Sequence, residues 1–439
     1  MIQLEKGLLS YRALFYYGLN NISSMRSLRF TALVLVAAII LLLIAGCTQP
    51  AGSGTPATTT APAEAGATVG ILYSKGVGPM PMLLATKQID GYIAWQPFVS
   101  IGSESKLGKV VAYSGNLPPI ASNANHPCCI LFASDSLIAQ NPGIVSSVSA
   151  LTQLSSKYII DHPEEASQLD AAFLVGGSNF TYGNVTVPSV DVLEDAFPTV
   201  KYTNEPTPAW VNATKQFVNT QIQLGYVTNQ LKTSDSARLD AQLFNFAPYQ
   251  SAKAMVAGNS FRTPAKMIEP ITIGYLNGDM HSAALHIALK KWQYFNNTYG
   301  IALKPRDATM ARPDMADLIV NGVPVAEVRL VGGDAGPQVM QMAATDIVQM
   351  GYLGVPPAIA AIDKGTPIKI INPVNTEGSG LIVDPNAPVT DWKSFVAWAQ
   401  QRSAAGNPLK IAAPGKGSIQ DVLLQFALKD SGLSFKESS

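Results

Sequence analysis

Residues 409–432 read LKIAAPGKGSIQDVLLQFALKDSG, and they contain the strand, turn and helix pattern on which the fold prediction is based. A short apolar run is followed by a glycine-containing turn, Pro414 to Ser418, and then by apolar residues at helical spacing. Free amides in such a turn, together with the positive end of the following helix, can bind an anion or a polar ligand group. No complete Gly-x-x-x-x-Gly-Lys-Ser sequence can be written here, so a plain strand-to-helix turn is an equal alternative.

The composition is that of a folded protein without net charge. The chain has 439 residues, of which 47% are hydrophobic and only 14% charged, so it can bury one large core or two lobes. Basic and acidic residues number 30 each, which argues against an overall attraction to nucleic acid. The three cysteines cannot make a disulfide framework, and the adjacent Cys128 and Cys129 would form only a strained bridge.

The amino-terminal residues resemble a lipoprotein signal peptide. Residues 25–29 carry two arginines and precede an apolar run, 30–45, that has the length of a signal-peptide core. The run ends in Ile-Ala-Gly-Cys, which resembles a lipobox and makes Cys47 the expected lipidated residue. Residues 1–47 are therefore expected to be signal peptide and lipobox, with Met25 as an alternative start. An uncleaved anchor helix is the other interpretation, and both put the rest of the chain outside the cell membrane.

A tether is predicted after the lipobox. Residues 48–67 are rich in Thr, Pro, Ala and Gly and cannot bury enough apolar surface to fold. Four glycosylation sequons agree with an extracytoplasmic surface, although such triplets also occur by chance. They begin at Asn179, Asn184, Asn212 and Asn296.

Strand and helix patterns alternate along most of the chain. In residues 68–251, strands are predicted at 68–73, 89–95, 109–113 and 128–133, with long helices after the last of these. Residues 252–270 are a polar connector. In residues 271–439, strands are predicted at 271–276, 326–331, 347–353 and 367–371, with helices at 281–295, 337–344, 357–363 and 391–402. This alternation predicts an α/β fold with mainly parallel sheets.

Two passages resemble each other. In the first passage, Gly78-Pro79 is followed by a helix and then by GYIAWQP at 91–97. In the second, Gly336-Pro337 is followed by a helix and then by GYLGVPP at 351–357. Two similar lobes are therefore expected.

These residues resemble the nitrate, sulfonate and taurine type of periplasmic substrate-binding protein of ABC importers. Residues 271–432 resemble the amino-terminal half of that family, through ITIGYLNGDMHSAALHIA, LVGGDAGPQVMQMAATDIVQMGYLG and LKIAAPGKGSIQDVLL. Residues 68–231 resemble its carboxy-terminal half, through LLATKQIDGYIAWQPF and NHPCCILFAS. The halves stand in reversed order.

The resemblance implies a two-lobed periplasmic-binding-protein type II fold in circularly permuted order, with 252–270 joining the old ends. One lobe is expected to contain 380–439 and about 68–119, and the other about 130–246 and 271–379. Residues 128–133 and 380–383 would be the crossing strands. The alternative is a fragment of a longer tandem protein, which would leave sheet edges exposed.

The ligand is expected between the lobes, at the carboxyl ends of the strands. Aspartates in such turns can simply cap helices, Trp95 can be core packing and Lys416 can be a solvated charge. The candidate ligand-binding residues are Asn277, Asp279, His281, Gly333, Asp334, Gly354, Glu377, Gly378, Ser379, Lys416, Gly417, Ser418, Trp95, Gln96, Asn125 and His126.

No metal or catalytic site is predicted. His126 with Cys128 and Cys129 lacks the usual two-residue cysteine spacing of a metal site, and His281 and His286 are five apart rather than four. No Gly-x-Ser-x-Gly elbow occurs.

The sequence therefore predicts a lipid-anchored solute-binding protein rather than an enzyme, monomeric and without a cofactor. Its expected partners are a small-molecule solute, an ABC permease with its ATPase, and the outer face of the cell membrane. The alternatives are a thiamine-related pyrimidine-precursor binding protein or enzyme of the same superfamily, and a solute receptor without a role in transport.

Overall fold

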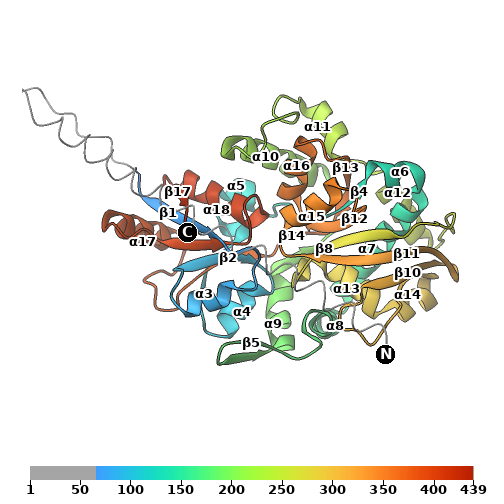
Figure 1. The fold of residues 1–439 in the computed structure, drawn as a ribbon, viewed down its shortest axis with the longest axis horizontal. Coiled ribbons are helices and arrows are strands. Elements are labelled where there is room, and N and C mark those ends of the chain that lie inside the picture. Colours follow the sequence, from blue (N-terminus) through green and yellow to red (C-terminus); the bar gives the residue numbers. More distant parts are fainter. Residues whose placement is uncertain (1–65, 439) are drawn as a thin grey trace, which may run out of the picture. The chain divides into compact units, whose positions relative to one another are not determined.

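Two large β-sheets organise residues 66–438, the part of the chain that the computed structural model describes (Figure 1). The predicted signal peptide, Cys47 and nearly all of the predicted tether lie outside the described residues. Within 66–438, no helix combines the length and the apolar character needed to cross a membrane.

The first sheet has six strands in the order β17-β1-β16-β2-β15-β3. Its strands come from both ends of the described chain: β1 (Thr68–Tyr73), β2 (Gly91–Trp95), β3 (Lys109–Tyr113), β15 (Ser379–Val383), β16 (Lys410–Ala413) and β17 (Ser434–Glu437). β1 pairs in parallel with β16 and β17, and β16 pairs in parallel with β2. β15 runs antiparallel to β2 and β3. Residues 66–113 and 379–438 are called the first lobe below.

Four helices pack on the first sheet: α3 (Met80–Ala85), α4 (Phe98–Glu104), α17 (Trp392–Ala404) and α18 (Ile419–Asp430). A capping box between Asp391 and Ser394 begins α17, and the side chain of Ser418 caps α18. α18 is buried on nearly all sides, because it lies between this sheet and helix α10 (Pro208–Leu224).

The second sheet has seven strands in the order β13-β4-β12-β8-β11-β10-β9. Their bounds are β4 (Cys129–Ser134), β8 (Ile271–Leu276), β9 (Ile301–Pro305), β10 (Met315–Val320), β11 (Val323–Gly333), β12 (Met350–Gly354) and β13 (Ile368–Pro373). β8 is central and parallel to β11 and β12, and all six of its residues are buried. β4 runs antiparallel between β12 and β13. Residues 129–373 are called the second lobe.

Most helices belong to the second lobe. They are α6 (Asp135–Gln140), α7 (Pro142–Asp161), α8 (Pro163–Val175), α9 (Ser189–Ala196), α10, α11 (Ser236–Leu243), α12 (Ala247–Gly258), α13 (Ala283–Lys290), α14 (Trp292–Tyr299), α15 (Gly336–Ala344) and α16 (Val355–Asp363). The 3-10 turns η2 (Phe197–Thr199) and η3 (Met280–Ser282) and the hairpin β5 (Asn179–Tyr182) and β6 (Val185–Pro188) complete this lobe. α7 packs against α12 and α13, and α15 against α16.

Two segments connect the lobes. Residues 114–128 contain η1 (Ser114–Asn116) and α5 (Ile120–Asn123), and residues 374–378 contain β14 (Asn375–Glu377). β14 pairs antiparallel with β7 (Val200–Tyr202) of the second lobe. Gly378 follows β14 with φ +82°, a conformation that favours glycine.

The predicted α/β class, with parallel strands at the centre of both sheets, is confirmed. β9 and β10 were not predicted, because they form an antiparallel meander with β11 instead of joining the strand–helix alternation. The single helix predicted at 281–295 divides into η3, α13 and α14, because Lys291 leaves the helical conformation. α12 extends to Gly258, within the predicted connector. The permuted order and the predicted lobe bounds stay predictions.

Candidate functional site

A small cavity of about 10 Å³ lies between the two lobes. The first lobe contributes Trp95, Ser418, Ile419 and Gln420, and the second contributes Cys129, Leu276, Asp279, His281, Gly336, Gly354 and Pro357. The cavity therefore brings together five predicted site residues: Trp95, Asp279, His281, Gly354 and Ser418.

Strand ends and helix starts position these residues. Trp95 ends β2 and Leu276 ends β8, while Gly354 ends β12 and precedes α16. Ser418 caps α18 across the cavity. Since the carboxyl ends of parallel strands form the binding edge of α/β sheets, the cavity lies where a ligand is expected in this fold.

Asp279 and His281 form a buried pair in the cavity wall. Asp279 Oδ1 lies 3.0 Å from His281 Nδ1, and it also accepts a hydrogen bond of 2.9 Å from the His281 backbone N–H. Burial lowers the pKa of His281, but the charge of Asp279 and the hydrogen bond to it outweigh burial and raise the pKa to about 10. At neutral pH the pair is therefore an imidazolium and a carboxylate, with no net charge.

Four buried polar atoms of cavity-lining residues have no hydrogen-bond partner among the described residues. They are Trp95 Nε1, Asp279 Oδ2, His281 Nε2 and Gln420 Oε1. His281 Nε2 faces the chain at Gly378, since a Cβ placed there would lie 2.1 Å from it. An indole N–H can only donate, whereas carboxylate and amide oxygens accept. Because buried polar groups are normally paired, these atoms indicate a ligand or water with both donors and acceptors.

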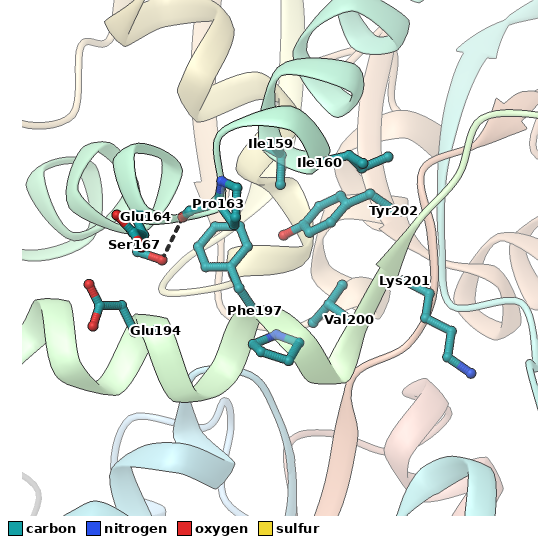
Figure 2. Close-up of a pocket in the computed structure, with 11 residues that line it drawn as sticks. Ile159, Ile160, Pro163, Glu164, Ser167, Glu194, Phe197, Val200, Lys201 and Tyr202 are labelled. Atoms are coloured by element: carbon teal, nitrogen blue, oxygen red, sulfur yellow. Dashed lines mark hydrogen bonds between the residues drawn. The ribbon is translucent and has the colours of Figure 1, made fainter.

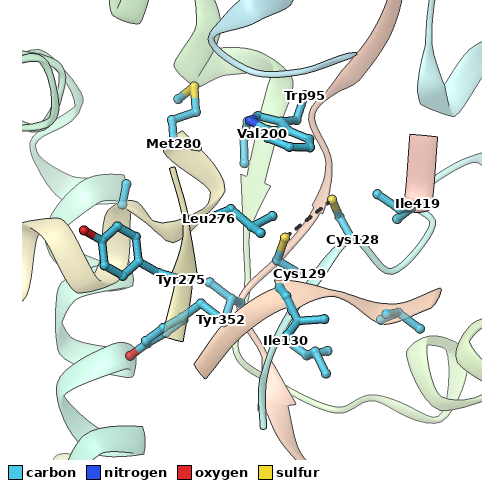
Figure 3. Packing of buried hydrophobic residues seen from close by; sticks show 14 of the residues in the cluster. Trp95, Cys128, Cys129, Ile130, Val200, Tyr275, Leu276, Met280, Tyr352 and Ile419 are labelled. Carbon is cyan, nitrogen blue, oxygen red and sulfur yellow. Dashed lines mark hydrogen bonds between the residues drawn. The ribbon is translucent and has the colours of Figure 1, made fainter. Parts of the chain in front are cut away.

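The side chains of Cys128 and Cys129 lie with their sulfur atoms facing each other (Figure 3), and Cys128 also approaches His281. Their sulfur atoms are 4.0 Å apart, and Cys128 Sγ lies 3.9 Å from His281 Nδ1. Cys128, Cys129 and His281 each offer one ligand atom, and these atoms lie within 4.8 Å of one another. In the sequence the cysteines stand near His126 instead, because contacts between distant segments cannot be seen there.

His126, Asn125 and Glu377 lie in the two connecting segments, and Ser379 begins β15 directly after one of them; none of the four lines the cavity. His126 Nε2 lies 2.9 Å from Ser114 Oγ, and Glu377 accepts from the Asn125 backbone N–H at 2.8 Å. Burial lowers the pKa of His126 to about 4. Ser379 Oγ accepts from Gln420 Nε2 at 2.9 Å and so joins this group to the cavity. These residues form the junction of the lobes.

Gln96 forms hydrogen bonds between the lobes. Its side-chain Nε2 donates to Thr199 Oγ1 at 3.0 Å, and its backbone carbonyl accepts from the Met280 N–H at 3.2 Å. Its Oε1 accepts from the Ser100 backbone N–H within the first lobe. Gln96 therefore links the lobes beside the cavity.

Asn277, Gly333 and Asp334 form a turn outside the cavity. Asn277 Nδ2 donates to Asp334 Oδ1 at 2.9 Å, and its backbone N–H donates to the Gly333 carbonyl. A Cβ added to Gly76 of the first lobe would lie 3.1 Å from the Asp334 carbonyl oxygen, so this turn contacts the opposite lobe.

The glycine turn before α18 differs from the expected anion site. Lys416 is exposed and pairs with Glu437 at 3.3 Å, outside the cavity. The Gly417 N–H donates to Asp421 within the same turn, and Ser418 Oγ accepts from the Asp421 N–H. The amide expected to bind an anion is thus already paired with a carboxylate.

Several residues of the cavity were not predicted from the sequence. Cys129 had been considered only for metal binding, and Gln420 follows the helix cap by two residues, a position that could have been recognised. The others not predicted are Leu276, Ile419, Gly336 and Pro357.

A larger open pocket of about 520 Å³ lies within the second lobe (Figure 2). Its walls come from the end of α7, the start of α8, α9, η2 and β7, and they are mainly apolar, with Glu164, Glu194 and Lys201 among them. Tyr202 OH donates to the Met280 carbonyl, and Ser167 Oγ to the Pro163 carbonyl. Among the described residues that line it, none carries a buried unpaired side-chain atom. The small cavity between the lobes is therefore the stronger candidate site.

Comparison with known proteins agrees with this architecture. A model of the NMT1-like family matches residues 269–438. The uncharacterized protein MJ1180 of Methanocaldococcus jannaschii is 30% identical over 118 residues, which are 27% of this chain and 78% of that protein. No solved structure matches. The family match supports a substrate-binding protein of this superfamily. Over residues 269–438 the chain is thus similar to the NMT1-like family.

Proposed function

We propose that the protein captures a small polar solute between its lobes and presents it to an ABC permease. The unpaired buried atoms of Trp95, Asp279 and Gln420 around the cavity between the lobes carry this proposal. A cavity of about 10 Å³ has room for one water, so a solute requires the lobes to lie further apart than they do here. Hinged closure around the solute would then bring these atoms against their partners on it.

The cavity favours a solute that carries both hydrogen-bond donors and acceptors. Asp279 Oδ2 and Gln420 Oε1 require donors, and Trp95 Nε1 requires an acceptor. Nitrate has no donor and would leave the two oxygens unpaired. No lysine or arginine is among the described residues that line the cavity. A zwitterion such as taurine, or a heterocycle with both N–H and ring nitrogen, meets these requirements better than a simple anion.

The experiment is native mass spectrometry of protein purified from its own cells, followed by titration with taurine, nitrate and an aminopyrimidine. Closure is followed by small-angle scattering. We expect taurine or the aminopyrimidine, and not nitrate, to bind and close the lobes. Asp279→Asn should weaken binding about 5- to 150-fold, since an unpaired buried group costs about 1–3 kcal/mol. Asp334→Asn, outside the cavity, is the control. Absence of a retained molecule and of any binding would refute the proposal.

A second candidate function rests on Cys128, Cys129 and His281. Their possible ligand atoms lie within 4.8 Å of one another, and thiolate and imidazole bind soft or borderline metals once the metal has displaced the protons of the thiols and of His281. This cluster favours the enzyme alternative, in which the same cavity would hold a pyrimidine precursor. Conversion of the bound molecule to a product, lost in Cys128→Ser and Cys129→Ser while binding persists, would decide for an enzyme.

We also propose that Cys47 is lipidated and anchors the protein outside the cell membrane. The apolar run and the Ile-Ala-Gly-Cys sequence support this. Cys47→Ser should release the protein from the membrane fraction, whereas Cys128→Ser should not. Equal membrane association of both variants would count against a lipid anchor.

The reversed order of the halves supports a circular permutation. The first sheet is built from β1, β2 and β3 together with β15, β16 and β17, and β1 lies between β16 and β17. A permuted lobe would have this arrangement, because its sheet must be completed by the two distant ends of the chain.

A further inference from the structure

The Asp421 carboxylate is buried and accepts four hydrogen bonds. Tyr73 OH and Gln425 Nε2 donate to Oδ1 at 3.0 and 2.7 Å, and the Gly417 N–H donates to Oδ2 at 2.8 Å. Tyr226 OH donates to Oδ2 at 2.5 Å. Three of these donors belong to the first lobe, as Asp421 does. Tyr226 alone comes from the second lobe.

Tyr226 lies in residues 225–231, the loop that follows α10, and hydrogen bonds fix this Tyr226 loop to the rest of the second lobe. Asp363, at the end of α16, accepts hydrogen bonds of 2.9 Å from the backbone N–H groups of Thr228, Asn229 and Leu231. Upstream of the loop, Gln221 Nε2 of α10 donates to the Pro356 carbonyl at 2.9 Å. The loop therefore moves with the second lobe, and its bond to Asp421 joins one lobe to the other.

The contact lies next to the cavity without forming part of it. Gln420 and Ser418 line the cavity, and Asp421 follows Gln420 directly in α18. The Tyr226 ring lies over the turn, 3.9 Å from where a Gly417 Cβ would stand. Tyr226 is not among the residues that line the cavity.

We propose that Tyr226 and Asp421 form a latch that holds the lobes closed over the cavity without touching the solute. Charge-assisted hydrogen bonds are stronger than neutral ones, so the bond favours the closed state. Opening removes only one of the four donors, and the other three keep the carboxylate paired. The latch can therefore open and close reversibly. Its effect on solute retention rests on the proposed function, whereas closure itself can be measured without a solute.

The buried cysteines report lobe opening. Cys128 and Cys129 are 0% and 2% exposed, and Cys129 lines the cavity between the lobes. The experiment measures how fast N-ethylmaleimide alkylates them in the full chain, with peptide mass spectrometry separating them from Cys47. Tyr226→Phe should speed alkylation about tenfold, equivalent to about 1.4 kcal/mol of lost closure free energy.

Tyr73→Phe is the matched control, because it removes a hydrogen bond to the same carboxylate from within the same lobe. Its alkylation rate should stay within about twofold of wild type. Urea unfolding first establishes that each variant is folded. If Tyr226→Phe is not, Gln425→Met serves instead, since it removes the second bond between the lobes at this contact, from Gln425 Nε2 to Tyr226 OH at 2.8 Å. It also removes the Gln425 bond to Asp421 within the first lobe, and Tyr73→Phe measures the effect of losing such a bond.

The proposed latch would be refuted if Cys128 and Cys129 were alkylated equally fast in Tyr226→Phe and wild type. It would also be refuted if Tyr73→Phe sped alkylation as much as Tyr226→Phe. Failure to find any solute would leave this result standing and would refute only the proposed function.

Discussion

The buried pair Asp279–His281 predicts a pH dependence of stability in the neutral to alkaline range. His281 has a pKa of about 10 in the folded protein, because Asp279 outweighs the effect of burial. In the unfolded chain the value returns to about 6.5. The folded state therefore holds one more proton between these two values, so its stability is fully present below about 6.5 and is lost as pH rises through about 10.

The expected size follows from the linkage relation. Each pH unit inside this window costs about 1.4 kcal/mol when one proton separates the two states. From pH 7 to pH 9 the pair should therefore lose about 2 to 3 kcal/mol of unfolding free energy. Asp279→Asn removes the charge that raises the pKa and leaves burial, which lowers it. The variant should lack this loss.

The assay is urea unfolding of wild type and Asp279→Asn at pH 7 and pH 9, followed by tryptophan fluorescence. Asp235→Asn is the matched control, because Asp235 caps α11 through the Arg238 N–H without a histidine partner. Because an Asn oxygen caps a helix about as well as an Asp oxygen, this control should change stability little and keep the wild-type difference between the two pH values. If Asp279→Asn keeps that difference too, His281 is not held protonated by Asp279, and the neutral-pair argument fails.

Three further outcomes are expected in urea unfolding. Gly378→Ala should lose roughly 3 kcal/mol, because its φ is +82° and a Cβ would meet His281 Nε2, whereas Gly406→Ala, with φ +73° and open space, should lose only about 1 kcal/mol. His126 has its pKa lowered to about 4 by burial, so stability should fall by about 2 kcal/mol from pH 6.5 to pH 4.5, and His126→Gln should abolish that fall. Phe132→Ala, at a fully buried position, should cost about 3–5 kcal/mol at every pH, and a smaller loss would mean that the core refills the space.

Local patterns account for the part of the fold that was predicted. A strand such as β8, ITIGYL, is buried on both faces, and its unbroken apolar run is visible in the sequence. The meander β9–β11 was missed because β10 alternates buried and partly exposed residues, a short pattern that is easily lost among polar loops. A fully buried strand was therefore easier to predict than a partly exposed one.

The site was predicted in part for the same reason. Strand-exit turns led to Asp279, His281 and Gly354, which do line the cavity. Lys416 was chosen for its place in the glycine turn, but its side chain pairs with Glu437 outside the cavity. The approach of Cys128 to His281 joins residues 153 positions apart, so only the folded chain brings them together.

Bonds between the lobes also bear on how tightly a solute is held. Gln96 to Thr199, Met280 to Gln96 and Tyr226 to Asp421 all form across the lobes and involve no ligand atom. A solute shifts the lobes toward closure only by its different affinity for the open and closed states. When the protein's own bonds already populate the closed state, a smaller part of the solute's binding free energy is used for closure, and the apparent affinity rises with the closed fraction. A weakened latch should therefore lower affinity for every solute by the same factor, whereas a change at Asp279 should alter the choice among solutes.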